Sequence, residues 1–305
     1  MLRMVVGRLL FLLPAALLII FLSFSMFYLI PGDPAVLIAG DNAPEEAIEA
    51  IREAYGLDRP LYAQFLSYVW RLLHGDFGMS IYSRVPVLQL LIPCYLNTLR
   101  LVGLAMAFGV TIGLAMGCVA SSYQGRGFDR LITSVSLTGI CTPVFLSALA
   151  AMYLFCVRMR LLPVGGSSTW KAYVLPVVTF GLFQAAFFTR MVRSCMIESI
   201  AKDYIRTARA KGLGSTKIVL KHALRNSLIP LITILGVRLG YAIGGAVVTE
   251  TIFTWPGIAR LMVGSVGSRD LPVVQGSLLL IGATLIMINL AVDIAYAIAD
   301  PRIEY

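Results

Sequence analysis

The chain of 305 residues is 58% hydrophobic and only 13% charged, and its mean hydropathy is +0.84. These values exclude an ordinary soluble domain, because several apolar runs reach the roughly 20 residues that cross a hydrocarbon core of about 30 Å. The net charge of +9 fits either a nucleic-acid surface or the topology bias of a membrane protein. The basic residues lie within a few residues of apolar runs, which favours a membrane protein without a nucleic-acid partner.

Six apolar segments predict an all-α membrane protein with six transmembrane helices. They are residues 9–30, 99–120, 131–157, 173–189, 227–249 and 273–298. The first segment follows two arginines and lacks a small-residue cleavage site, so we expect an N-terminal transmembrane helix over residues 1–30 that stays in the chain. An external loop, 31–96, and a five-helix core, 97–305, make up the rest.

The distribution of basic residues predicts the orientation. If both termini are cytoplasmic, the internal segments hold 14 of the 25 lysines and arginines against five acids, and the external segments hold nine against ten. Cytoplasmic loops carry this kind of excess. We therefore predict cytoplasmic N and C termini, with residues 31–96 outside and residues 190–226 inside.

The external loop contains the start and stop residues of two helices. Pro44, followed by two glutamates, is typical of a first helical turn, and Gly56 is typical of a helix end. A second helix is expected from Leu61 to His74, with aromatic residues suited to a membrane–water interface. Two interpretations stay open, a cap that contacts a partner on the outer surface and a packing collar without one.

Glycine recurs at every fourth position in two predicted spans. The positions are Gly109, Gly113 and Gly117, and Gly236, Gly240 and Gly244. Such stripes let another helix backbone approach closely, either within this subunit or from a second one.

Arg238 falls near the middle of the fifth predicted span, where an unpaired cation costs about 2.5–3.5 kcal/mol. It must therefore face protein or water, and Asp293 in the sixth span is the obvious acidic partner. The two residues form either a structural ion pair or part of a translocation path. By position alone, Asn97, Gln184 and Asn289 join them as candidate path residues.

The basic insert 190–226 is longer than a connection between two spans needs. The fourth span is expected to continue as a helix, Asp203 to cap a short helix over Tyr204–Lys211, and Gly212 to end it. Ser215 is expected to cap a further helix over Lys217–Arg225. Small and basic residues on the short helix predict a docking face for another protein: Arg206, Thr207, Ala208, Arg209, Ala210, Lys211 and Gly212.

Eight short motifs, in order along the chain, carry a resemblance to a known family. They are PGDP at 31–34, GLDRPLYAQF at 56–65, GDFGMS at 75–80, RTARAKG at 206–212, HALRNSLIP at 222–230, WPGIARL at 255–261, RDLPVVQ at 269–275 and DPRI at 300–303. Together they resemble the permease subunits of ATP-binding-cassette importers, in the branch that handles dipeptides, oligopeptides, glutathione and nickel. The resemblance implies the type I importer permease fold, with Arg206–Gly212 as the cytoplasmic coupling helix that seats in an ATPase subunit. Arg206 and Thr207 replace the Glu and first Ala of the general coupling motif.

The resemblance also implies the assembly: a homologous second permease, two ATPase subunits, an external substrate-binding protein and membrane lipid, in the cytoplasmic membrane of a bacterium. The chain has no phosphate-binding Gly-x-x-x-x-Gly-Lys-Ser/Thr loop. His74 and His222 are expected at helix ends, and the five cysteines are dispersed. We therefore predict no catalytic residue, metal site or cofactor in this chain, with ATP and Mg bound by partner subunits.

Short peptides, including glutathione, are the expected substrates. A nickel chelate is the alternative within the same family. An alternative from another class is a stand-alone secondary transporter with Arg238 and Asp293 as coupling charges, although the chain has no internal repeat of the kind common in such transporters.

Overall fold

The computed structural model describes residues 2–29, 33–39, 43–214 and 217–299. Within these residues, the regular elements are helices, and the only strand-like pairing is an isolated bridge between Met79 and Pro86. The chain divides into two compact units, one of residues 1–96 and 257–287 and one of residues 97–256 and 288–305. Residues 257–287, grouped by sequence with the core 97–305, thus pack with the N-terminal region.

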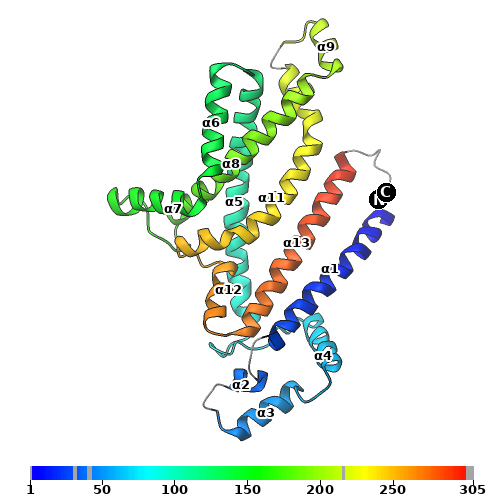
Figure 1. The fold of residues 1–305 in the computed structure, drawn as a ribbon, viewed down its shortest axis with the longest axis vertical. Coiled ribbons are helices and arrows are strands. Elements are labelled where there is room, and N and C mark those ends of the chain that lie inside the picture. Colours follow the sequence, from blue (N-terminus) through cyan, green and yellow to red (C-terminus); the bar gives the residue numbers. More distant parts are fainter. Residues whose placement is uncertain (1, 30–32, 40–42, 215–216, 300–305) are drawn as a thin grey trace. The chain divides into compact units, whose positions relative to one another are not determined.

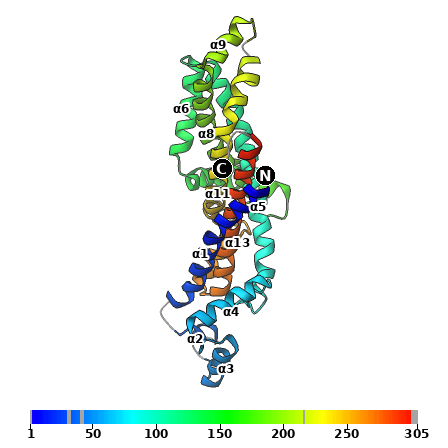
Figure 2. The same cartoon turned by 90° about the vertical axis from the view of Figure 1, so that its right-hand side faces the viewer.

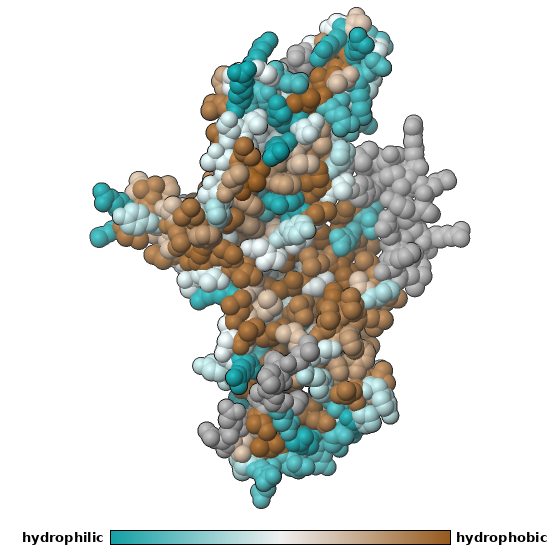
Figure 3. Space-filling model, in the orientation of Figure 1, coloured by the Kyte–Doolittle hydropathy of each residue, from teal (hydrophilic) through white to brown (hydrophobic). Residues whose placement is uncertain are grey.

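Unit 1 (1–96 and 257–287) is built from seven helices or parts of helices in its described residues (Figure 1). They are α1 (Leu2–Leu29), α2 (Pro34–Ala39), α3 (Glu45–Tyr55), α4 (Leu61–Leu73), the start of α5 (Val87–Ser122), α12 (Ile258–Gly267) and α13 (Leu271–Ala299) as far as Met287. In Figure 3 hydrophobic residues cover the face over α13, and hydrophilic residues gather over α3.

The two helices predicted in the loop 31–96 are confirmed. Helix α3 begins directly after Pro44, which lies just before the helix rather than in its first turn, and has two glutamates in its first turn. It ends at Gly56, whose φ of 63° is a left-handed conformation that glycine adopts without strain. Helix α4 follows, and His74 caps its end as expected, with Nδ1 2.8 Å from the Trp70 carbonyl oxygen.

A buried carboxylate holds the loop between α4 and α5. Asp270, only 3% exposed, accepts hydrogen bonds from the Ser80 hydroxyl (2.5 Å) and from the backbone amides of Ile81 (3.1 Å) and Tyr82 (3.4 Å). Two of the sequence motifs, GDFGMS and RDLPVVQ, therefore meet at one site. Since the carboxylate accepts from the buried Ser80 hydroxyl and from two partly buried amides, it fixes the path of this loop.

Unit 2 (97–256 and 288–305) holds the rest of the described helices. They are the rest of α5, α6 (Gly127–Cys141), α7 (Val144–Met152), η1 (Tyr153–Arg158), α8 (Trp170–Ile200), α9 (Asp203–Ala210), η2 (Ile218–Ala223), α11 (Leu224–Ile252) and the end of α13. Helix α9 lies beyond the C-terminal end of α8 (Figures 1 and 2).

Four described helices are long and apolar enough to cross a membrane. Their apolar segments are Val87–Ser122, Trp170–Ile200, Pro230–Ile252 and Leu271–Ala295. The helix pair α6 and α7 with η1 makes a fifth span if the pair is counted as one. The apolar part of α1 within the described side chains, Leu12–Tyr28, is shorter than these spans.

The segment predicted as a span, 131–157, is formed by two helices with a bend between them rather than by one continuous helix. Helices α6 and α7 are bent by 94° at Thr142 and Pro143 (Figure 1). Proline has no amide hydrogen to continue a helix and pushes the residue before it out of the helical region. Thr142 accordingly has an extended backbone, with φ −79° and ψ 120°. The hydropathy of the segment did not indicate this break.

The first glycine stripe packs within the subunit. A β-carbon at Gly109 would lie 2.7 Å from the β-carbon of Gln184, and one at Gly117 would lie 2.6 Å from the β-carbon of Val192. Helix α5 therefore approaches α8 so closely that only glycine fits. The second stripe is divided, because Gly236 contacts Val292 whereas the space beside Gly244 is open.

Candidate functional site

The basic insert 190–226 contains a short helix, α9, between two long helical segments. Helix α8 continues to Ile200, well past the predicted apolar span, and the extended backbone of Lys202 (φ −76°, ψ 153°) separates it from α9. Asp203 is the first residue of α9 rather than a side-chain cap. Gly212 adopts a φ of 75° and its amide donates to the Arg209 carbonyl oxygen (2.9 Å), which closes the helix.

Helix α9 is held in place by two apolar side chains. Ile205 is fully buried and Ala208 is 6% exposed. They belong to one apolar cluster with residues of α8, η2 and α11: Val192, Met196, Ile218, Val219, Ala223 and Leu231. The methyl group of Ala208 therefore faces the subunit's own core, so the outer surface of α9 is formed by the other residues of the predicted docking face.

The outward face of α9 (Arg206, Thr207, Arg209, Ala210, Lys211 and Gly212) is exposed and basic. Within it, Arg206 lies 3.7 Å from Asp203, but these side chains are 80% and 95% exposed. Such an exposed ion pair contributes little to stability. The positive charges of this face are thus available to an acidic surface on another protein.

Hydrogen bonds connect the two long helices beside α9. The Ser199 and Ser227 hydroxyl oxygens lie 2.8 Å apart, and the Ser227 hydroxyl also lies within hydrogen-bond distance of the carbonyl oxygens of Ala223 (2.9 Å) and Cys195 (3.2 Å). Together with the apolar cluster, this contact joins α8 and α11 at the base of α9.

The helix predicted over Lys217–Arg225 does not end before the fifth span. The π-helix η2 runs directly into α11, and Pro230 lies inside α11 rather than at a break between helices. Consequently His222, expected at a helix end, lies in η2 within a continuous helical segment. The predicted cap, Ser215, lies outside the described residues.

An ion pair that was not predicted from the sequence joins α8 to α6. The Arg193 guanidinium on α8 donates two hydrogen bonds to Asp129 in the first turn of α6, from Nε (2.5 Å) and from a terminal nitrogen (2.8 Å). The amide of Gly125 also donates to this carboxylate (2.8 Å). Such two-bond arginine–carboxylate pairs are geometrically specific. The position of Asp129 next to a glycine-rich turn was the sequence signal that could have indicated this pair.

Two predicted path residues do meet, Gln184 and Arg238. A terminal nitrogen of Arg238 donates to the Gln184 side-chain oxygen at 2.9 Å, and the guanidinium lies 3.9 Å from the ring centre of Phe187. The expected ion pair with Asp293 is not among the contacts described for Arg238. The contacts described for Arg238 are with polar and aromatic side chains of α8, and Asn289 on α13 is exposed.

Asn97 has a structural role. Its amide nitrogen donates to the Pro256 carbonyl oxygen (3.1 Å), and its backbone oxygen accepts from the indole nitrogen of Trp255 (3.2 Å). Next to it, Thr98 donates to the fully buried Glu250 (2.5 Å). Glu250 was not recognised in the sequence, although it is the only acidic residue in α11. This network fixes the end of α11 against α5.

Comparison with known proteins decides the family. Residues 109–305 match the family described as the inner membrane component of binding-protein-dependent transport systems, and residues 1–101 match the N-terminal part of such membrane components. The chain belongs to this family.

Relatives in the family match along the whole chain. Over 305 residues, covering 100% of both chains, the sequence is 43% identical to the glutathione transport system permease protein GsiC of Salmonella typhimurium and 41% identical to GsiC of Escherichia coli K12. The family assignment of the sequence motifs is therefore confirmed, from the PGDP motif to the end of the chain.

Solved structures share the fold. A chain of the inward-facing MetNI methionine ABC transporter superposes with a TM-score of 0.60 at 20% identity, covering 70% of this chain and 97% of its own. An amino acid ABC transporter gives a TM-score of 0.52 at 18% identity, covering 70% and 94%. At these identities the likeness establishes a common fold and nothing more. The type of fold expected from the sequence resemblance is thus confirmed.

Proposed function

We propose that this chain is one of two permease subunits of an ATP-driven importer that moves glutathione and short peptides across a bacterial cytoplasmic membrane. Full-length identity of 41–43% to glutathione permeases supports the substrate class. The observation that carries the importer mechanism is α9, a short helix with a buried apolar side and an exposed basic side at the end of α8.

The proposed topology has six spans with both termini in the cytoplasm. Helix α1, with 28 residues, supplies the first span, and the bent pair α6 and α7 supplies the third. The excess of basic residues in 190–226 supports a cytoplasmic position for α9 and an external position for residues 31–96. An impermeant thiol reagent should label a cysteine at Asp58 but not one at Arg209 in intact cells.

In the proposed mechanism this subunit does no chemistry. Separate ATPase subunits bind ATP and Mg, and their closure displaces α9. Because Ile205 and Ala208 pack against α8 and η2, the displacement reaches the transmembrane parts of α8 and α11. These helices then alternate between outward and inward access, together with the second permease. An external binding protein delivers the substrate.

Gln184 and Arg238 are the proposed path residues that the geometry favours. Glutathione and peptides carry carboxylates, and a guanidinium is the side chain best suited to bind them. The Nε atom of Arg238 is buried and has no hydrogen-bond partner among the described residues, so the subunit does not fully satisfy this cation. Asn289 and Asp293 stay candidates by position, and Asn97 is assigned to structure.

Reconstitution of the whole complex tests this function. Proteoliposomes with both permeases, both ATPases and the binding protein should accumulate labelled glutathione and dipeptides only when ATP is present on the side of the membrane that carries the ATPases. Uptake without ATPases, driven by an ion gradient, would establish a secondary transporter instead. Uptake of nickel chelates without peptide uptake would overturn the substrate class and leave the importer assignment standing.

A further inference from the structure

Helix α4 has the two faces of a helix that lies in a membrane interface. Its outer stripe consists of apolar and aromatic side chains that are 63–75% exposed: Tyr62, Leu66, Trp70 and Leu73. With 13 residues the helix is too short to span a bilayer. A short helix with an exposed apolar stripe and aromatic residues is typical of the boundary between headgroups and acyl chains.

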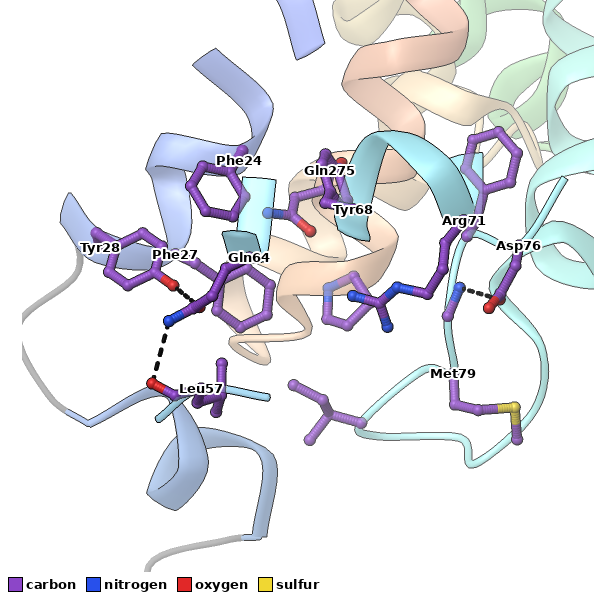
Figure 4. Close-up of a pocket in the computed structure, with 14 residues that line it drawn as sticks. Phe24, Phe27, Tyr28, Leu57, Gln64, Tyr68, Arg71, Asp76, Met79 and Gln275 are labelled. Carbon is purple, nitrogen blue, oxygen red and sulfur yellow. Dashed lines mark hydrogen bonds between the residues drawn. The ribbon is translucent and has the colours of Figure 1, made fainter. Parts of the chain in front are cut away.

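The opposite side of α4 lines a pocket of about 80 Å³ within unit 1, whose lining is mostly apolar but includes several polar side chains (Figure 4). Gln64, Tyr68 and Arg71 come from α4, Gln275 from α13, and Asp76 from the loop after α4. In Figure 4 the Arg71 side chain reaches into the pocket from α4. The volume is several times the 10–15 Å³ that holds one water molecule, so a small polar group fits.

Internal hydrogen bonds occupy the neutral polar groups of this pocket. The Gln64 amide donates to the backbone oxygens of Leu57 (3.0 Å) and Arg59 (2.7 Å), and the Gln275 amide donates to the Ser23 backbone oxygen (2.8 Å). The lining also holds two charged side chains, the cation Arg71 and the anion Asp76. Although Asp76 accepts from the Gly78 amide (2.9 Å), a carboxylate has further acceptor sites.

An apolar groove of about 250 Å³ adjoins this pocket, because Phe77 lines both. The groove runs between α1, α4 and α13, and small or aliphatic side chains form it, among them Ile20, Leu72 and Ala283. Two of these three helices are apolar and long enough, or nearly so, to lie in the hydrocarbon core. The groove therefore has the chemistry of an acyl-chain site.

We propose that unit 1 binds one zwitterionic aminophospholipid, with its phosphate at Arg71, its ammonium at Asp76 and an acyl chain in the groove beyond Phe77. The charge pattern selects the headgroup, since one cation and one anion complement a phosphate and an ammonium but not a purely anionic headgroup. The lipid joins α4 to α1 and α13 and stabilises the folded unit, as any ligand of the native state does.

A peptide zwitterion has the same pair of charges, but the apolar groove favours a lipid. A short peptide would leave the groove empty, whereas a phospholipid fills the pocket and the groove together. The exposed stripe of α4 also places the pocket at the depth of lipid headgroups.

Lipid retention by the full chain tests this proposal. The chain is purified in detergent, equilibrated with an equimolar mixture of phosphatidylethanolamine, phosphatidylglycerol and phosphatidylcholine, and its bound lipids are measured by mass spectrometry. We expect bound phosphatidylethanolamine to exceed each of the other two bound lipids at least about fivefold. Arg71→Met should abolish the enrichment, and Arg59→Met, which removes an exposed arginine outside the pocket, should preserve it.

A second variant keeps the test independent of folding effects at Arg71. Ala283→Trp fills the groove from an exposed position and leaves the pocket around Arg71 intact, so it should also abolish the enrichment. Equal retention by the wild type and both variants would overturn the proposal. Equal enrichment of phosphatidylglycerol would overturn the headgroup assignment, and thermal stabilisation by glutathione without lipid enrichment would make the pocket a solute site.

Discussion

The loop held by Asp270 in unit 1 and helix α9 in unit 2 use polar residues in opposite ways. In the loop, the Ser80 hydroxyl and two backbone amides point inward to a buried carboxylate. In α9, two apolar side chains point inward and the charged residues point outward. Both segments have sequence motifs of the same family, but the first motif maintains the fold and the second presents a surface. The direction of the polar groups distinguishes them.

The largest effect on thermal stability is expected in the loop held by Asp270, where the polar groups point inward. Asp270→Ala should leave the buried Ser80 hydroxyl without its acceptor, at a cost of about 1–3 kcal/mol, and should also remove the acceptor of two partly buried amides. We expect a large loss of thermal stability of the purified chain in detergent, followed by tryptophan fluorescence. Asp58→Ala, at an exposed position, is the matched control and should behave as the wild type. An unchanged unfolding temperature for Asp270→Ala would contradict the claim that the polar groups of this loop maintain the fold.

Two alanines on α9 sharpen the comparison, because Ala208 is buried and Ala210 is exposed. Ala208→Glu should destabilise the segment, since a buried carboxyl without a partner costs several kcal/mol. Ala210→Glu should leave the unfolding temperature unchanged and weaken ATPase binding about tenfold or more, a loss of about 1.4 kcal/mol. Thermal unfolding and co-purification of the ATPase measure the two effects. Equal behaviour of the two variants in both assays would argue against the assigned faces.

A moderate effect is expected at the ion pair between Asp129 and Arg193. Removing one partner leaves the other charge partly buried, whereas removing both avoids this penalty. Asp129→Asn and Arg193→Gln should each lower stability by about 1–3 kcal/mol, the size of a charged hydrogen bond. The double variant should lose less than the sum of the two single losses. Additive losses in the unfolding temperature would show that the pair does not interact.

The smallest effect concerns pH and the pair of Asp33 and Arg52 (2.5 Å). The Ala35 amide and the Arg52 guanidinium lower the pKa of Asp33. A lowered pKa stabilises the fold above the unfolded pKa of about 3.9, and this stabilisation is lost as pH falls through the folded value. Both side chains are about one-third exposed, at 35% and 34%, so screening keeps the effect small.

Unfolding temperatures of the wild type and Asp33→Asn between pH 7 and pH 3 measure this effect. The small advantage of the wild type at pH 7 should vanish at the acid end. A difference that stays constant with pH would exclude ionisation of Asp33 as its cause.

Local residues were enough to predict the short helices. Pro44 and Gly56 delimited α3, and Gly212 delimited α9, because capping depends on a few neighbouring residues. The break at Pro143 also depends on a local residue, but it was not predicted, because the hydropathy of the whole segment indicated one span. Long-range pairings were not predictable, since Ser80 and Asp270 are separated by 190 positions and no local pattern joins them.

Which face of α9 is buried could not be predicted from the sequence, for a different reason. A helix of eight residues has only about two turns, so its small and apolar residues fit either an inner or an outer face. Ala208 is directed inward by the neighbouring η2 and α8, which no residue of α9 specifies. The hydrogen bond between Arg238 and Gln184 was not predicted either, because Gln184 is neutral and only an acidic partner was considered for Arg238.

Photo-crosslinking from the outward face of α9 tests the central claim most directly. A photoreactive phenylalanine analogue replaces Arg209, and in a control it replaces Arg126 in the exposed turn before α6. In the assembled complex, irradiation should join the Arg209 variant to an ATPase subunit with much higher yield than the Arg126 variant. An intact complex in which Arg209 gives no ATPase adduct, or no more than Arg126, would contradict the assignment of α9 as the docking element.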